Sequence, residues 1–78
     1  MWYIATFHTH LAALSTYRAL CAAGARAQLA PVPRTLSASC GTCVRYEADS
    51  PREELLHRDF ERVVRMEDEQ TVVSNRED

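Results

Sequence analysis

The alternation of apolar and polar positions divides the chain into two strand–helix–strand halves joined by a polar loop. The segment 2–7 is aromatic and β-branched with period-2 alternation, which is typical of a strand. The segment 10–23 is rich in Ala and Leu at helical spacing, and Thr9 and Gly24 stand where an N-cap and a C-cap are expected. The first half therefore predicts a strand followed by an amphipathic helix.

The same reasoning assigns the rest of the chain. We predict a strand over 27–30 and a strand over 44–48. A helix capped by Asp49 or Ser50 follows, beginning at Pro51 and ending near Asp59, and then a strand over 61–67 that could instead prolong this helix. Pro51 suits the first helical position, and the two glutamates after it suit the positive end of the helix dipole. The polar segment 69–78 predicts a disordered tail after a single domain over 1–68.

The order of these elements is β-α-β-loop-β-α-β. Because each helix has a single apolar stripe, both helices must cover the same face of the sheet. The expected fold is therefore α+β, a ferredoxin-like sandwich in which a four-stranded sheet carries two helices on one face. The other face would be partly exposed, with Trp2 or Tyr3 on it, and an exposed apolar face favours a homodimer.

Composition narrows the compartment and the class of partner. A net charge of -2 over 78 residues gives no long-range attraction to nucleic acid or to anionic membranes. No apolar run approaches the roughly 20 residues that span a bilayer, and the opening MWYIATF lacks the basic region of a signal peptide. We therefore expect a cytoplasmic protein. The odd number of cysteines, three, favours thiols over a disulfide framework.

The polar loop holds the residues with the clearest chemical potential. Cys40 and Cys43 are spaced C-x-x-C, so both thiols can face one tight turn and exchange sulfur or form a disulfide. Backbone N–H groups, arginines and a hydroxyl could favour the reactive thiolate. The candidate catalytic residues are Cys40 and Cys43, and the candidate supporting residues are Arg34, Ser39, Gly41 and Arg45.

Two other interpretations of the cysteines stay open. The pair supplies half of a tetrahedral metal site, which His8 and His10, or a second cysteine pair in a dimer, could complete. Alternatively, both cysteines are small buried residues at the start of a strand. Cys21 falls on the apolar stripe of the first helix, where we expect a buried and inert side chain.

The phrase from Pro31 to Tyr46 resembles the hallmark loop of the selenium/sulfur carrier-like family. It contains P-V-P-R, then L-S-A-S-C-G, then a second cysteine and V-R-Y, and the segment 3–24 resembles the opening of the family. The resemblance implies a cytosolic carrier of sulfur or selenium in which Cys40 is the acceptor. Cys43 matches those members that have a second cysteine.

The hypothesis that follows is a carrier rather than a stand-alone enzyme. Cys40 would accept sulfur or selenium as a persulfide or selenosulfide from a donor protein, and Cys43 would help to pass it to an acceptor protein. The two arginines, Arg34 and Arg45, would favour the anion or dock the partner. No cofactor and no resident metal are expected. The alternative is a non-catalytic dimeric interaction or metal-binding module that uses both cysteines structurally.

Overall fold

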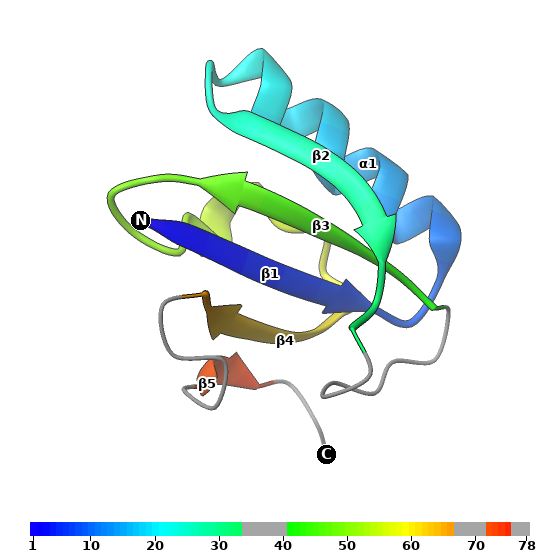
Figure 1. The fold of residues 1–78 in the computed structure, drawn as a ribbon. Coiled ribbons are helices and arrows are strands. Elements are labelled where there is room, and N and C mark those ends of the chain that lie inside the picture. The colour runs from blue at the N-terminus through cyan, green and yellow to red at the C-terminus, as the bar shows by residue number, and fades with distance from the viewer. Residues whose placement is uncertain (34–40, 67–71, 76–78) are drawn as a thin grey trace.

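The computed structural model describes residues 1–33 and 41–66, together with the backbone of 72–75. Over these residues the chain forms one antiparallel sheet with a single α-helix against one face (Figure 1). The elements, in chain order, are β1 (Trp2–Phe7), α1 (His10–Ala22), β2 (Arg26–Pro31), β3 (Thr42–Glu47), the 3-10 turn η1 (Glu53–Leu55), β4 (Phe60–Arg65) and β5 (Val72–Asn75).

The strand order in the sheet is β2-β3-β1-β4-β5, and all four neighbouring pairs are antiparallel. Strands β1 and β2 therefore run in the same direction with β3 between them, and α1 crosses from one to the other. Figure 1 shows α1 lying behind the half of the sheet formed by β2 and β3. The α+β class and the four predicted strands are confirmed.

The first helix follows its local signals closely. The Thr9 hydroxyl accepts a hydrogen bond from the Ala12 N–H at 3.1 Å, which satisfies one of the free donors of the first turn. At the other end Gly24 has a φ of +85°, a left-handed conformation that glycine adopts without strain. The helix packs through a stripe of mostly small buried residues, Ala12, Ala13, Thr16 and Leu20.

The predicted second helix is wrong, because the described chain between β3 and β4 has only the 3-10 turn η1. Arg52 precedes it in a left-handed conformation with a φ of +52°, and Leu56 ends it in an extended one. Three residues cannot form a second α-helix, and a segment of about ten would be marginal on its own. The extended chain instead lets Leu56 reach the core, where it is 9% exposed. The two-helix ferredoxin-like arrangement is therefore not confirmed.

The C-terminal segment contains an element that the sequence analysis did not predict. Strand β5 (Val72–Asn75) pairs with β4 and lies within the range 69–78, for which we expected a polar tail. The register aligns Val63 with Ser74 and Val64 with Val72, with an irregularity between the two pairs. The sheet thus extends beyond the four strands that alternation indicated.

The core fills the space between the sheet and α1. Tyr3 and Tyr46 lie opposite each other on β1 and β3, and their rings stack with centroids 5.4 Å apart. Phe7, Leu20 and Val63 are fully buried beside them. Tyr3 therefore belongs to the helix side of the sheet and not to its other face. No helix among the described residues is long and apolar enough to cross a membrane.

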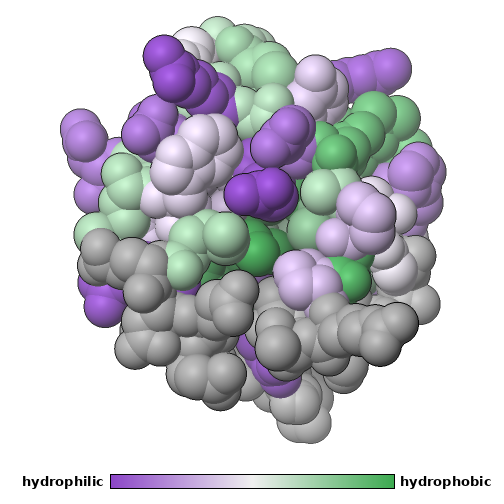
Figure 2. Space-filling view, viewed as in Figure 1, coloured by the Kyte–Doolittle hydropathy of each residue, from purple (hydrophilic) through white to green (hydrophobic). Residues whose placement is uncertain are grey.

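The face of the sheet away from α1 is less exposed than we expected. By the register, Ile4, Thr6, Cys43 and Val64 share this face, and each is at most 3% exposed. Figure 2 views the molecule from this side, and a small apolar area is visible near its centre with hydrophilic residues directly above it. This face is thus a second, smaller buried layer.

Candidate functional site

The described part of the C-x-x-C segment, residues 41–43, contacts the end of β2 and the start of α1. Gly41, Cys43 and Arg45 belong to the described structure. The other three predicted site residues, Arg34, Ser39 and Cys40, lie outside the described residues. The geometry of the site is therefore built from its β3 side.

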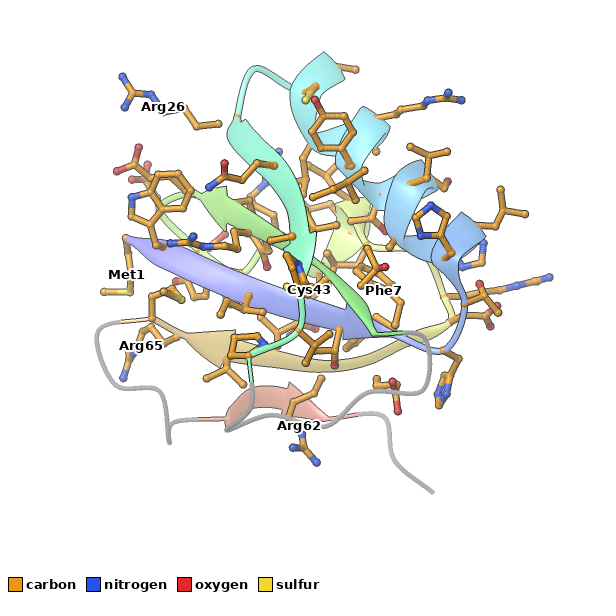
Figure 3. All side chains as sticks on the ribbon, turned by 45° about the vertical axis from the view of Figure 1, so that its right-hand side comes forward. Met1, Phe7, Arg26, Cys43, Arg62 and Arg65 are labelled. Atoms are coloured by element: carbon orange, nitrogen blue, oxygen red, sulfur yellow. The ribbon has the colours of Figure 1, made fainter. Side chains whose placement is uncertain are left out.

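Cys43 is held as a buried thiol on the second residue of β3. Its exposed fraction is 0%, and its Sγ donates to the carbonyl oxygen of Pro31 at 3.6 Å. Figure 3 shows Cys43 near the end of β2, which agrees with this contact. In the register, Cys43 lies opposite Thr6 on one side and Ala30 on the other. A reagent from solution therefore reaches this sulfur only after a local opening of the structure around it.

Gly41 closes the base of the loop. Its carbonyl oxygen accepts a hydrogen bond from the N–H of Val32 at 3.1 Å, so the two ends of the loop are joined directly. Gly41 has a φ of +74°, which an L-residue adopts only with strain. No atom of the described residues lies within 4 Å of where a Cβ would be, so among these residues it is backbone conformation and not crowding that favours glycine here. Gly41 thus provides the left-handed backbone conformation with which the chain enters β3 at Thr42.

His10, which the sequence analysis considered only as a metal ligand in one of the alternatives, contacts the C-x-x-C segment. Its Nδ1 lies 3.3 Å from the hydroxyl of Thr42, the residue directly before Cys43. His10 is the first residue of α1, and Thr42 is the first residue of β3. Only the packing of α1 across β2 and β3 brings these two ends together, so no local pattern could have indicated the contact. The result is an exposed imidazole beside the C-x-x-C segment.

Arg45 is on the same face of β3 as Cys43, two residues further along. It lies opposite Ile4 and Gln28 and is half-buried. Two residues along a strand are separated by roughly 6–7 Å, so the cationic side chain starts within one strand repeat of the thiol. Its Nε is buried, and no group of the described residues accepts a hydrogen bond from it. This arrangement supplies positive charge on the side of the sheet that holds the sulfur.

Cys21 is exposed, so the expectation that it is a buried core residue is wrong. The buried stripe of α1 contains Ala13, Thr16 and Leu20, and Cys21 lies to one side of it. A hydrogen bond to the Cys21 side chain, followed by its charge and by partial burial, raises the pKa of Tyr17. The thiol that solution can reach in the described structure is therefore Cys21, and Cys43 is the buried one.

Two other features do not add to this site. Within 1–33 and 41–66, no three His, Cys, Asp or Glu side chains are grouped so that they could hold a metal ion. A hollow of about 480 Å³ lies at the opposite end of the sheet. Its lining comes from the chain start, the end of α1 and the segment after β3, and includes Met1, Gly24, Glu47 and Arg52.

Comparison with known proteins identifies the family of the chain. No curated protein and no solved structure matches the chain. A family model described as "Putative Se/S carrier protein-like" matches residues 2–57, a range that runs from β1 to just beyond η1 and includes the C-x-x-C segment. The match covers more than half of the chain and confirms the resemblance found in the sequence. The chain belongs to the Se/S carrier protein-like family.

Proposed function

We propose that this protein carries sulfur or selenium in the cytosol as a persulfide or selenosulfide on Cys40. The observation that carries the proposal is that the family-matched range contains a C-x-x-C segment whose base is closed by the Val32–Gly41 hydrogen bond. Cys40 is bonded to Gly41, the residue at this closed base. A carrier needs a thiolate that can attack the persulfide of another protein, and the proposal gives this role to Cys40.

The loading step is a transfer between thiols. The Cys40 thiolate attacks the outer sulfur of a donor persulfide, an S–S bond forms on Cys40, and the donor leaves as its thiolate. No net oxidation occurs, because the sulfane sulfur keeps its oxidation state. An acceptor protein then attacks the outer sulfur of the Cys40 persulfide and restores the Cys40 thiolate. Selenium would follow the same route as a selenosulfide.

Cys43 would act as a resolving thiol held in reserve. Its S–H donates to Pro31 and its side chain is buried, so it does not compete with Cys40 for the donor. When the Cys43–Pro31 contact opens, Cys43 as the thiolate attacks the inner sulfur and forms a disulfide with Cys40, and the outer atom leaves as sulfide or selenide. A cellular dithiol then reduces this disulfide. In the proposal, Arg45 supports the anion, and His10 positions Thr42 between the two cysteines.

The test is a loading assay on the reduced protein. Inorganic polysulfide should add about 32 Da to the intact chain, and a selenium donor about 80 Da, with dithiothreitol removing either adduct. Peptide mapping should place the adduct on Cys40. Cys40→Ser should abolish it, while Cys21→Ser, which removes the exposed thiol of α1, should not. An adduct that disappears only in Cys21→Ser would overturn the assignment of Cys40.

One observation favours the alternative function, a non-catalytic module in which the cysteines are structural. Cys43 is buried within the β2–β3 pair, as a packing residue would be. In that case Cys43→Ser should lower the melting temperature strongly, and no sulfur adduct should form on Cys40. Zinc or iron that co-purifies and is lost in Cys43→Ser would identify the metal-binding form of this alternative.

A further inference from the structure

Strand β2 is an edge strand of the sheet in the part of the chain that the structure describes. It pairs with β3, and no strand of the described chain pairs with its other side (Figure 1). Arg26 and Gln28 are exposed, and Leu29 is 36% exposed although it is apolar. An edge of this kind can pair with a further strand unless something blocks it.

The hydrogen bonds at the end of β2 show which of its groups face outward. The Val32 N–H donates to the Gly41 carbonyl oxygen. Because the bonding direction alternates along an antiparallel strand, the N–H and C=O groups of Ala30 and Gln28 also face β3. The Ala48 N–H donates to Met1, which directs the alternate set of β3 residues to β1 and agrees with this assignment. The N–H and C=O groups of Ala27 and Leu29 therefore point away from the sheet.

These four outward groups are self-complementary. If a second copy pairs antiparallel about a two-fold axis at Gln28, Ala27 of each copy lies opposite Leu29 of the other. Both pairs can then exchange N–H and C=O groups. An axis at Leu29 would place Pro31, which has no N–H, opposite Ala27. An axis at Ala27 would place Leu29 opposite Ala25, which precedes β2. Of these three registers, the one about Gln28 is thus the one that pairs all four outward groups of Ala27 and Leu29.

The side chains fit the same register. On the α1 side, the small Ala27 of one copy faces the larger Leu29 of the other. On the opposite side, the two Gln28 amides face each other, and Arg26 faces Ala30 of the other copy. No like charges are therefore directly opposite. The Arg26 guanidinium also lies 4.0 Å from the Glu47 carboxylate of its own chain, which draws it back from the edge.

Helix α1 adds an apolar margin to this edge. Thr16 contacts the segment after η1 through His57, whereas His10 contacts Thr42 beside the end of β2. Residues 14, 17 and 21, at helical spacing from His10, are therefore on the β2 side of α1. They are Leu14, Tyr17 and Cys21, the first two half-buried and the third exposed.

From this geometry we propose that the occupant of the β2 edge is a second copy of the same chain. The two sheets join through β2 into one continuous sheet, and the two-fold axis passes between the Gln28 residues. Both α1 helices then lie on the same face and cover Leu29. Ala25 of one copy faces Pro31 of the other, so the turn after one copy's helix lies beside the entrance to the other copy's C-x-x-C loop.

The first test measures the mass in solution. The wild-type chain should sediment at about 1 mM with twice its monomer mass of 8.8 kDa. Ala27→Pro removes an outward N–H without removing a bond to β3, so it should give a folded monomer. Leu29→Arg, which leaves the backbone unchanged, should do the same and covers the case in which Ala27→Pro does not fold. A wild-type protein that stays monomeric overturns the proposal.

The second test traps the register. Gln28→Cys in a Cys21→Ser, Cys40→Ser background should give an intermolecular disulfide on mild oxidation with diamide, because non-hydrogen-bonded partners have Cα atoms about 4.5 Å apart. Arg26→Cys in the same background is the control. Its two copies would be four positions apart, roughly 13 Å, and should not cross-link. A wild-type dimer in which both variants cross-link equally, or neither does, uses another surface and overturns the assignment.

Discussion

At the scale of single residues, the structure reverses the expected accessibility of two cysteines. Cys43 is fully buried on β3, and Cys21 is exposed on α1. Spacing within a helix gives the relative directions of its side chains but not which direction meets the sheet, so the phase of α1 could not be fixed from Leu14 or Cys21 alone. The same limit applies to Cys43, because its burial depends on Thr6 and Pro31, which are distant in the sequence.

Thiol labelling tests this reversal. In the native protein, limiting iodoacetamide should modify Cys21 much faster than Cys43, since burial blocks approach to the sulfur. In denaturant the two rates should become similar. Peptide mass spectrometry after short exposure gives both rates, and equal native labelling would contradict the burial of Cys43.

Tyr46 predicts how stability changes at alkaline pH. Burial, followed by the charges of Tyr3 and Glu53, raises the pKa of Tyr46 well above its usual value. The unfolded chain therefore loses the Tyr46 proton near pH 10, while the folded chain keeps it to higher pH. The stability that this difference affects is fully present below pH 10 and is lost as the pH rises above that value. Unfolding in urea should show a steeper fall in stability above about pH 10 in the wild type than in Tyr46→Phe.

The same variant tests a hydrogen bond at neutral pH. The Tyr46 hydroxyl donates to the Pro51 carbonyl at 2.5 Å, and Tyr46→Phe removes the donor while it keeps the ring. We expect a loss of roughly 0.5–1.5 kcal/mol in the free energy of unfolding. An unchanged value at pH 7 would mean that water replaces the hydroxyl without cost.

At the scale of elements, prediction succeeded where the signals are local. Strand β1 and helix α1 have every local signal that predicts them: alternation over the strand, the Thr9 cap at the start of the helix and Gly24 after its end. The second helix failed because Pro51 and the two glutamates after it suit a single 3-10 turn as well as a helix. The deciding contacts are long-range, since the His57 N–H donates to the Thr16 hydroxyl on α1 at 2.8 Å. No pattern within the segment encodes that bond.

Thr16 is therefore expected to hold the turn segment on the helix. Thr16 is 1% exposed, and its hydroxyl accepts a hydrogen bond from the His57 N–H. Thr16→Val should therefore leave this partly buried N–H without its acceptor. The cost should be about 1–3 kcal/mol. Denaturant unfolding of Thr16→Val beside Thr16→Ser, which keeps the hydroxyl, separates the lost bond from the lost packing. If both variants lose the same stability, the bond is not the cause.

At the scale of the whole molecule, the sheet includes strands that lie beyond the family-matched range, and it has one strand more than the sequence predicted. The matched range ends at residue 57, before β4 begins at Phe60. Strand β4 nevertheless pairs along β1 and contributes Phe60 and Val63 to the core. The part of the fold outside the matched range is therefore integral to the domain, and β5 extends it further.

Removal of all residues after Met66 tests how much β5 contributes. The register gives three residue pairs between β4 and β5, and at roughly 0.2–1 kcal/mol each the deletion should cost about 0.6–3 kcal/mol. For a domain of this size, each kcal/mol lowers the melting temperature by about 4–8 °C. A matched control deletes only 76–78 and keeps β5, and its melting temperature should stay near that of the full chain. If both deletions melt with the full chain, residues 69–78 contribute no stability, and the domain boundary at 68 expected from the sequence is the right one.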